Sequence, residues 1–382
     1  MLQRAPKIRE ICGLVSFVAD VLVLGAGVIG CAVAEELTRR GATVEVVDPR
    51  GVGLGASQAS AGMLSPYTEG RHDPVLQELG ARSLARYDAL VARLRADGYR
   101  VRYSRNGSIE LALDENAADA LAQESATLTR DGIAHTLSDG EQSRARTPGL
   151  ALAIATLEIP AHGAVNVPEL VEAMWLSAER KGARLTLRRA RAIAPGHGNV
   201  RVETTDGPLD APHVVLAAGC WAGQIDLADV PPLPVRPVRG QLVSLGLPAV
   251  PVAQALWGPG CYLVPWDDGT LLVGATVEEA GFEEQATLGG VASLLHAAPR
   301  LLPAAALATF AGVRVGLRPG TPDNRPVIGR SSKIDGLVYA TGHYRNGALL
   351  APITAELVAD LVEGRALDSA LAPYAPSRFG EY

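Results

Sequence analysis

The sequence has 382 residues, of which 48% are hydrophobic and 20% charged, which is typical of a globular protein with two or three domains. The net charge of −6 and the pI of about 5.7 argue against a nucleic-acid-binding protein, because such proteins usually carry a strongly basic surface. No uncharged apolar stretch reaches the roughly 18 residues that a membrane span requires, so no membrane span is expected.

The chain begins with basic residues followed by the apolar run Ile11–Val18, a weak signal-peptide pattern. Phe17 is too large for the usual cleavage pattern and Asp20 interrupts the run, so residues 1–17 are interpreted as an N-terminal extension. The four cysteines form no C-x-x-C pair and the histidines form no zinc pattern. We therefore expect buried free thiols, no metal site and a reducing, cytoplasmic location.

The first regular elements predict a βαβ unit. Val21–Leu24 is a short apolar run typical of a buried parallel strand. Val28–Arg40 has helical spacing, and Gly41 is a suitable residue to end that helix. Thr43–Val47 is a second, β-branched strand, which completes the unit within about 30 residues.

The rest of the chain alternates between helical and strand patterns. Helices are expected at Pro74–Ala96, Ala117–Arg130, Pro168–Lys181, Leu288–Ala297 and Ala348–Glu363. Strands are expected at Ser108–Leu113, Arg184–Leu187, Asn199–Thr204, His213–Ala217, Gln241–Leu245, Gly260–Pro265, Thr270–Thr276 and Gly336–Thr341. Asn166 is expected to cap the helix Pro168–Lys181, with Glu169 as its capping-box partner. Asp267-Asp268-Gly269 predicts a hairpin, so residues 235–280 should form an antiparallel sheet.

The turn after the first strand carries the dinucleotide fingerprint G-x-G-x-x-G. Gly25 permits a tight turn, Gly27 lets the backbone approach a pyrophosphate, and Gly30 lets the helix pack closely on the strand. The pyrophosphate would meet free N–H groups at the positive end of the helix dipole. Asp48 ends the second strand and is placed to accept hydrogen bonds from an adenosine ribose.

The fingerprint alone leaves NAD and FAD open, and three features favour FAD. The motif lies at the start of the chain, and a second glycine-rich stretch, Gly51–Met63, follows the second strand directly. Its small residues would let backbone pass close to a flavin, although a flexible surface loop is the alternative. Val214–Trp221 is a late strand that ends in Ala-Gly at Gly219, as in many FAD-binding folds.

The fold class expected from these patterns is α/β, with a Rossmann-like FAD-binding domain interleaved with a substrate domain built on a mostly antiparallel sheet. The FAD-binding domain is predicted to comprise residues 18–100, 162–230 and 318–372. The substrate domain is predicted to comprise residues 101–161 and 231–317.

Two C-terminal motifs carry a family resemblance. Gly316–Asp323 reads GLRPGTPD, and Gly342–Pro352 reads GHYRNGALLAP. With these motifs the chain resembles the D-amino-acid oxidase superfamily, and more closely the glycine oxidases of thiamine-thiazole biosynthesis, over nearly its whole length. Sarcosine oxidases resemble it less, because they carry a flavin-linking cysteine in the segment that matches residues 312–328, which contains no cysteine. Non-covalent FAD is therefore implied.

The resemblance implies a role for individual residues. Arg318 matches the arginine that pairs with the substrate carboxylate, Tyr262 the tyrosine that closes over it, and Arg345 a second arginine of the site. The residues that match FAD contacts are Val28, Ile29, Asp48, Ala56, Ser57, Ala61, Gly62, Met63, Arg191, His343, Tyr344, Arg345, Asn346, Gly347, Ala348 and Leu349. Gly260 and Val277 replace the histidine and methionine of some members, and both are expected to line or flank the substrate pocket.

Each of the three catalytic candidates also has a structural interpretation. Arg318 could form a structural salt bridge, Tyr262 could belong to the core, and Arg345 could hold the C-terminal turn together.

The activity implied is oxidative deamination of a small amino acid, most of all glycine, and also sarcosine or small D-amino acids. A hydride would pass from the α-carbon to flavin N5, and O₂ would reoxidise the flavin to give H₂O₂. The imine would hydrolyse or serve thiazole synthesis. The alternatives are a dehydrogenase of D-amino or N-methyl amino acids with a quinone or protein acceptor, and a non-catalytic flavin-binding partner subunit. Homo-oligomerisation is left open.

Overall fold

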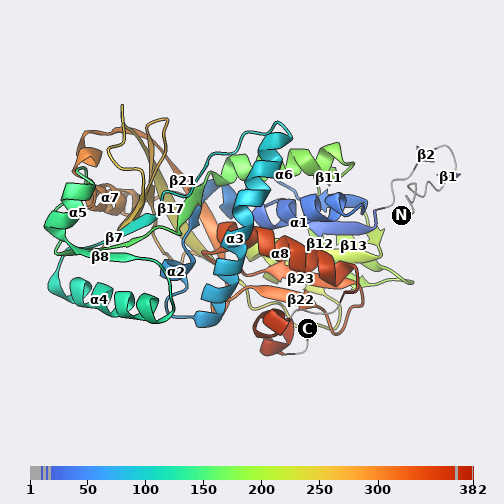
Figure 1. Cartoon of the computed structure of the whole chain (residues 1–382). Coiled ribbons are helices and arrows are strands. Elements are labelled where there is room, and N and C mark those ends of the chain that lie inside the picture. Colours follow the sequence, from blue (N-terminus) through green and yellow to red (C-terminus); the bar gives the residue numbers. More distant parts are fainter. Residues whose placement is uncertain (1–9, 12–13, 16–18, 366–368, 381) are drawn as a thin grey trace.

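The computed structural model of the chain describes residues 10–11, 14–15, 19–365, 369–380 and 382. The N-terminal extension expected over residues 1–17 lies almost wholly outside the described residues, which there include only the short paired strands β1 (Glu10–Ile11) and β2 (Leu14–Val15). Figure 1 shows two large sheet-containing halves, with the long helix α3 (Pro74–Ala96) crossing between them.

The first half is built on a six-stranded sheet in the order β11-β4-β3-β15-β23-β22. The strands are β3 (Val21–Leu24), β4 (Val44–Val47), β11 (Arg184–Thr186), β15 (His213–Leu216), β22 (Val327–Arg330) and β23 (Leu337–Thr341). All neighbouring strands are parallel except β22, which runs antiparallel to β23 at the edge. The expected Rossmann-like sheet is therefore present.

Helices cover one face of this sheet and a small sheet covers the other. Val21, Val23 and Val215 contact a core made with α1 (Val28–Arg39), α3, α6 (Val167–Arg180) and α8 (Gly347–Val362). The alternate residues Leu22 and Leu24 face the opposite way, because successive side chains of a strand point to opposite faces. Their core is shared with a four-stranded sheet of β12 (Ala190–Pro195), β13 (Val200–Thr204), β14 (Leu209–Ala211) and β16 (Asp226–Leu227).

The second half is built on an eight-stranded, mostly antiparallel sheet in the order β21-β17-β20-β19-β18-β7-β9-β8. Its strands are β7 (Ser108–Ala112), β8 (Thr136–Asp139), β9 (Ala155–Ile159), β17 (Arg236–Gly246), β18 (Ala255–Gly258), β19 (Cys261–Pro265), β20 (Thr270–Gly274) and β21 (Thr309–Gly320). One parallel pair, β18 with β7, joins the two segments of chain that contribute to it. The expected antiparallel sheet is thus larger than the sequence indicated.

Shorter elements complete the described chain. They are η1 (Ala56–Ala59), β5 (Met63–Leu64), α2 (Pro66–Glu69), β6 (Tyr103–Ser104), α4 (Glu115–Arg130), α5 (Gly140–Arg146), β10 (Gly163–Val165), η2 (Gly219–Gln224), α7 (Leu288–Ala297), η3 (Ala298–Arg300), η4 (Pro303–Leu307), η5 (Ser369–Tyr374) and η6 (Pro376–Phe379). No helix among the described residues is long and apolar enough to cross a membrane.

The two-domain division stays a prediction, and the two large sheets are compatible with it. Every strand of the six-stranded sheet comes from the segments assigned to the FAD-binding domain. The eight-stranded sheet draws on the segments assigned to the substrate domain, and only the last residues of β21 cross the proposed boundary at residue 318.

One local expectation is wrong. The Asn166 side chain does cap α6, accepting a hydrogen bond from the Glu169 N–H at 3.1 Å. The Glu169 carboxylate, however, does not complete a capping box. It accepts hydrogen bonds from the Arg102 N–H at 2.7 Å and from Arg102 Nε at 2.8 Å, because a charged partner on the neighbouring segment outcompetes the cap backbone.

Candidate active site

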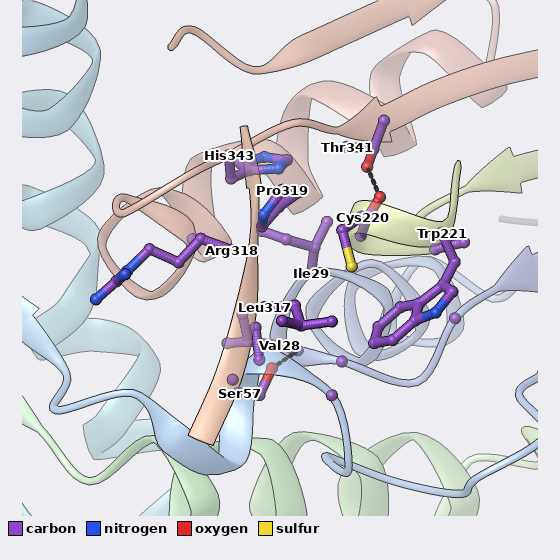
Figure 2. Close-up of a pocket in the computed structure, with 18 of the residues that line it drawn as sticks. Val28, Ile29, Ser57, Cys220, Trp221, Leu317, Arg318, Pro319, Thr341 and His343 are labelled. Carbon is purple, nitrogen blue, oxygen red and sulfur yellow. Dashed lines mark hydrogen bonds between the residues drawn. The ribbon is translucent and has the colours of Figure 1, made fainter. Parts of the chain in front are cut away.

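A cavity of about 700 Å³ lies where the two large sheets meet. On one side it is lined by the carboxyl ends of the parallel strands, at Leu24, Val47, Ala217 and Thr341. On the other side it is lined by residues of β17, β19 and β21. The carboxyl ends of parallel strands are where ligands bind in open α/β sheets. Figure 2 shows Arg318 and Trp221 at opposite sides of the part drawn.

The glycine-rich turn after β3 requires glycine at two positions, and a third glycine lines the cavity. Gly25 has a φ of +112°, and a Cβ there would lie 2.4 Å from the Ala217 carbonyl oxygen. A Cβ on Gly30 would lie 1.8 Å from the Gly25 oxygen, so α1 could not pack as it does. Gly27 caps α1 without a side-chain hydrogen bond and lines the cavity. The helix dipole therefore presents its positive end to the cavity.

The side chains around this turn hold it in place. Ser57 Oγ accepts a hydrogen bond from the Val28 N–H at 2.9 Å (Figure 2). Asp48 Oδ2 accepts one from the Ala26 N–H at 2.9 Å, while Oδ1 accepts one from the Arg50 N–H at 2.8 Å. Asp48 lines the cavity, so its carboxylate both stabilises the turn and faces the space expected for a ribose.

The second glycine-rich stretch, Gly51–Met63, is not the surface loop that was its alternative interpretation. It forms η1 and packs between α6 and β21. Gly316 of β21 lies so close to η1 that a Cβ on it would be 3.0 Å from Ala59 Cβ and 3.1 Å from Ala56 Cα. Gly62 has a φ of +74°, and a Cβ there would lie 1.8 Å from the Val165 oxygen. Small residues therefore let this segment line the cavity.

Together, these residues fit a bound dinucleotide. The N-cap residue of α1 is a glycine, which leaves the helix N-terminus open to a pyrophosphate, and the cradle of glycine and alanine that continues from it would be filled by larger side chains. We call the part near Gly27, Asp48 and Trp221 the nucleotide end. The part near Arg318 and Tyr262 is called the carboxylate end.

Arg318 lies at the carboxylate end without an acidic partner. Its Nη1 donates to the Thr276 carbonyl oxygen at 3.0 Å and to the Arg239 carbonyl oxygen at 3.3 Å. Among the described residues, no Asp or Glu forms an ion pair with it. Burial lowers the pKa of its guanidinium, partly offset by Tyr262. The salt-bridge interpretation of Arg318 is therefore not supported, and the guanidinium can receive a carboxylate.

Two glycines make room for the side chains at this end. A Cβ on Gly240 would lie 2.4 Å from the Arg318 guanidinium nitrogens, and one on Gly274 would lie 2.4 Å from the Tyr262 ring. The Tyr262 ring also packs against Trp257, with centroids 5.1 Å apart. Burial raises the pKa of the Tyr262 phenol, so it remains a hydrogen-bond donor at neutral pH.

Arg345 forms a two-point ion pair with Glu69. Its Nε and Nη2 lie 2.9 and 3.0 Å from the two carboxylate oxygens. Burial opposes the charge on Arg345, but Glu69 raises its pKa overall. Both residues line the cavity and also a second one of about 480 Å³ on the far side of the pair. Arg345 is thus neutralised by a neighbour, in contrast to Arg318.

The motif at residues 342–352 forms the turn and first part of α8. His343 is buried, its Nε2 lies 3.0 Å from Thr354 Oγ1, and burial lowers its pKa to about 3, so it is neutral. Tyr344 has a φ of +48° and, with Gly347 and Ala348, lines the cavity. Asn346 gives α8 no side-chain cap, so a second helix N-terminus faces this region.

Comparison with known proteins decides the family. Residues 20–361 match the FAD-dependent oxidoreductase family DAO. The chain belongs to this family. It is 37% identical to a glycine oxidase of Geobacillus kaustophilus, over 94% of this chain and 97% of that protein. It is 36% identical to a bifunctional ThiO/ThiG protein of Synechocystis, over 94% of this chain and 54% of that longer protein.

Solved structures of DAO-family proteins agree with this assignment. A crystal structure of the Geobacillus kaustophilus glycine oxidase is similar with a TM-score of 0.92 and 34% identity, covering 95% of this chain and 99% of that one. An iminodiacetate oxidase of Chelativorans has a TM-score of 0.85 and 30% identity, covering 93% and 98%. The expected fold class, the FAD cofactor and the enzyme class are thereby confirmed.

In this DAO-family enzyme most residues predicted for the site line the one large cavity. They are Gly25, Gly27, Val28, Ile29, Asp48, Ala56, Ser57, Ala61, Gly62, Met63, Arg191, Gly219, Tyr262, Arg318, His343, Tyr344, Arg345, Gly347 and Ala348. Gly30 lies behind the turn, Asn346 lines the second cavity, and Leu349 packs against Gly80. Their assignment as cofactor contacts, like that of the others, stays a prediction.

Gly260 and Val277 were expected to line or flank the substrate pocket; they do not line it, and that they flank it stays a prediction. Gly260 occupies the turn between β18 and β19, with a φ of +86°, and Val277 is 52% exposed. Neither residue lines the cavity. The backbone conformation explains why glycine occupies position 260, because residues with a side chain rarely adopt that φ.

Sequence reasoning missed Glu69, Arg50, Trp221 and Glu284, all of which line the cavity. Glu69 ends the short helix α2, and no motif or spacing distinguishes it from a surface acid. Trp221 is the last residue of the stretch Val214–Trp221, whose pattern favours FAD, so of the four residues it was the easiest to predict from the sequence.

Proposed function

We propose that the enzyme oxidises the C–N bond of a small amino acid, with glycine the leading substrate and sarcosine or small D-amino acids as further ones. The observation that carries this proposal is the half-buried Arg318 guanidinium, which has no acidic partner among the described residues and faces the cavity. Uncompensated cations are costly to bury, so such a group indicates an anionic ligand.

Arg318 and Tyr262 would hold one substrate carboxylate between them. The planar guanidinium fixes the plane of a carboxylate by two parallel hydrogen bonds, and the Tyr262 hydroxyl donates a third. Arg318 lies in β21 and Tyr262 in β19, and β17 and β20 lie between these two strands in the same sheet, so the sheet fixes the distance between the two side chains. The substrate α-carbon is thereby held in a fixed position.

The Glu69–Arg345 pair favours a substrate with a single carboxylate. Arg345 is already neutralised by Glu69, so it is not a second free anchor for a dicarboxylate. This distinguishes the proposed substrates from iminodiacetate, which the related Chelativorans enzyme is named for.

The chain needs no general base of its own for this reaction. The substrate reacts as the neutral amine, and His343 is neutral, buried and bonded to Thr354, so it is not placed to take a proton. FAD, when bound, would supply a two-electron acceptor for this oxidation, with O₂ as the proposed final oxidant and H₂O₂ as its product. The residues Arg318 and Tyr262 contribute orientation and exclusion of water.

Further parts of the proposal concern the surroundings of the reaction. We further propose O₂ as acceptor, a cytoplasmic location, homo-oligomer formation and supply of imine for thiazole synthesis. The relative named ThiO/ThiG supports the link to thiazole synthesis, since a matching segment is fused there to a second protein. The competing proposals are a dehydrogenase with a quinone or protein acceptor and a flavin-binding subunit without turnover.

The test is a substrate panel on the purified yellow protein with peroxide detection under air. Glycine and sarcosine should be among the better substrates, and iminodiacetate should be poor. Arg318→Ala should lose on the order of a hundredfold or more in kcat/KM and keep its flavin, because a carboxylate then lacks its buried partner. Arg236→Ala, which removes an exposed arginine of β17, is the matched control.

The outcomes separate the alternatives. Flavin bleaching by glycine without peroxide would favour a dehydrogenase. No bleaching by any amino acid under anaerobic conditions would favour the non-catalytic subunit. Equal activity of Arg318→Ala and the wild type would refute the role of Arg318.

A further inference from the structure

A strap of chain, residues 279–286, runs between β20 and α7 with both of its ends tied to the same buried residue. Gln241 Nε2 donates to Glu278 Oε1 at 2.7 Å and to Thr287 Oγ1 at 2.9 Å, while its Oε1 accepts from the Thr287 N–H at 3.0 Å. Gln241 is fully buried in β17. The ends of the strap are thus fixed on the sheet of the second half.

The middle of the strap reaches across to the first half. Glu284 Oε2 lies 2.8 Å from Arg50 Nη1, and the Phe282 ring lies 6.1 Å from the Trp221 ring at an interplanar angle of 38°. The Arg50 guanidinium in turn lies over the Trp221 ring, 4.2 Å from its centroid. These four side chains, which we call the clamp, connect the strap to the segments that follow β4 and β15.

The clamp lies at the nucleotide end of the cavity. Arg50, Trp221 and Glu284 line it, and the Arg50 N–H binds the Asp48 carboxylate that faces the ribose position. Trp221 lies on the side of the cavity away from Arg318 (Figure 2). The clamp is therefore far from the substrate carboxylate and close to the nucleotide.

The contacts of the clamp are exposed to solvent and weak enough to break and re-form. Arg50 and Glu284 are each one-third exposed, and exposed ion pairs are weak and screened by salt. Phe282 is 41% exposed, and residues 281–287 are all exposed, so the strap can move without breaking a core. The other walls of this end are strand ends and the η1 backbone, which are fixed by the sheet.

We propose that the strap is a retaining element for FAD, which closes the nucleotide end when Phe282 packs on Trp221 and Glu284 pairs with Arg50. FAD is exchanged only when these contacts open. The proposal requires the family's cofactor and is independent of the substrate.

The test measures FAD exchange and not turnover. Release is followed by the rise in flavin fluorescence after dilution of the holoprotein, and uptake by mixing apoprotein with FAD. Phe282→Ala should raise the release rate about tenfold, the effect of one lost aromatic pair, and should also raise the uptake rate because the opening is no longer covered. Leu288→Ala, which truncates an 88% exposed leucine next to the strap, should change neither rate.

A second pair of variants tests the ion pair. Glu284→Gln should raise the release rate a few-fold and weaken its dependence on salt, because the Arg50 contact is then uncharged on one side. Glu283→Gln removes a neighbouring exposed charge and should behave as the wild type. If Phe282→Ala does not fold, the comparison of these two conservative variants still tests whether the strap retains FAD.

The proposal is overturned if release from Phe282→Ala or Glu284→Gln stays within about twofold of the wild type, the scatter expected for surface substitutions. It is also overturned if release rises while uptake falls, since that pattern means a damaged binding site and not an opened one. Faster release together with faster uptake supports it.

Discussion

The two ends of the cavity are built in opposite ways. The nucleotide end consists mainly of backbone and small residues, in which glycines at positions 25, 27 and 62 remove side chains. The carboxylate end consists of long side chains, Arg318 and Tyr262, and there glycines on the opposing strands make room for them. The nucleotide end therefore recognises its ligand by main-chain N–H groups and helix dipoles, and the carboxylate end recognises its ligand by the charged guanidinium of Arg318.

This difference predicts that the two ends can be damaged separately. A change in the glycine-rich turn should remove the cofactor and with it all activity. A change beside Arg318 should leave the cofactor in place and reduce only the use of the substrate.

The largest effect is expected from Gly30→Ala. The added Cβ would lie 1.8 Å from the Gly25 oxygen, so α1 must move away from the turn. We expect a loss of about 1–3 kcal/mol in stability and less than roughly one tenth of the wild-type flavin content. The flavin-to-protein absorbance ratio and urea unfolding measure both.

Gly289→Ala is the control for Gly30→Ala. Gly289 also lies in the first turn of a helix, but a Cβ there would meet nothing within 4 Å. It should keep its flavin and gain up to about 1 kcal/mol from helix propensity. Equal flavin content in the two variants would contradict the packing argument.

A smaller effect is expected from Gly240→Ala at the other end. The added Cβ would displace the Arg318 guanidinium, which lies 2.4 Å from its position. A misplacement of this size should lower kcat/KM by about tenfold to a hundredfold, with the flavin content unchanged. Steady-state kinetics with glycine and the absorbance ratio check the two parts.

Gly246→Ala, in the same strand β17, is the matched control for Gly240→Ala. A Cβ at Gly246 would have its nearest neighbour, the Thr309 oxygen, at 4.0 Å. Its kinetics should equal those of the wild type. If Gly240→Ala also lost its flavin, the two ends would not be independent.

The same contrast explains what could be predicted from the sequence. The nucleotide end is local in the chain, so the spacing of Gly25, Gly27 and Gly30 between a strand and a helix was sufficient to identify it. The bounds of α3 and α7 were also predicted correctly from their helical periodicity, and in the structure Asp73 and Thr287 cap their N-termini.

The carboxylate end could not be found from spacing. Glu69 and Arg345 are 276 positions apart, and Tyr262 and Arg318 come from separate strands, so only the family resemblance suggested the last two. The strand β21 was not expected either, because its sequence TFAGVRVGLRPG contains glycines and a proline and has no clean alternation. Its long pairing with β17 overrides that weak propensity.

The smallest effect on activity is expected at the junction between the two halves, where His162 is fully buried. Its Nδ1 lies 2.7 Å from Ser108 Oγ, and its ring stacks on Tyr67 with centroids 5.5 Å apart. Burial, aided by nearby arginines, lowers its pKa to about 3. Between these two pKa values His162 is therefore neutral in the folded state but protonated in the unfolded state, where its pKa has the ordinary value of about 6.5.

Stability should therefore be complete above pH 6.5 and fall as the pH drops towards 3. Between pH 6.5 and 4.5 the wild type should lose about 2 kcal/mol more than His162→Gln, which cannot titrate. Urea unfolding at several pH values measures this difference, with the exposed His197→Gln as the control. Parallel curves for His162→Gln and the wild type would refute the linkage, and activity at pH 8 should be unchanged.

The position of β15 has a consequence for synthesis on the ribosome. This strand pairs with β3 on one side and with β23, from residues 337–341, on the other. Until residues 337–341 have emerged, the nascent sheet therefore has an open hydrogen-bonding edge on β15, beside the future flavin position. Because Ala340, Thr341 and His343 line the cavity, we expect chains that end before β23 to bind no flavin and to be colourless.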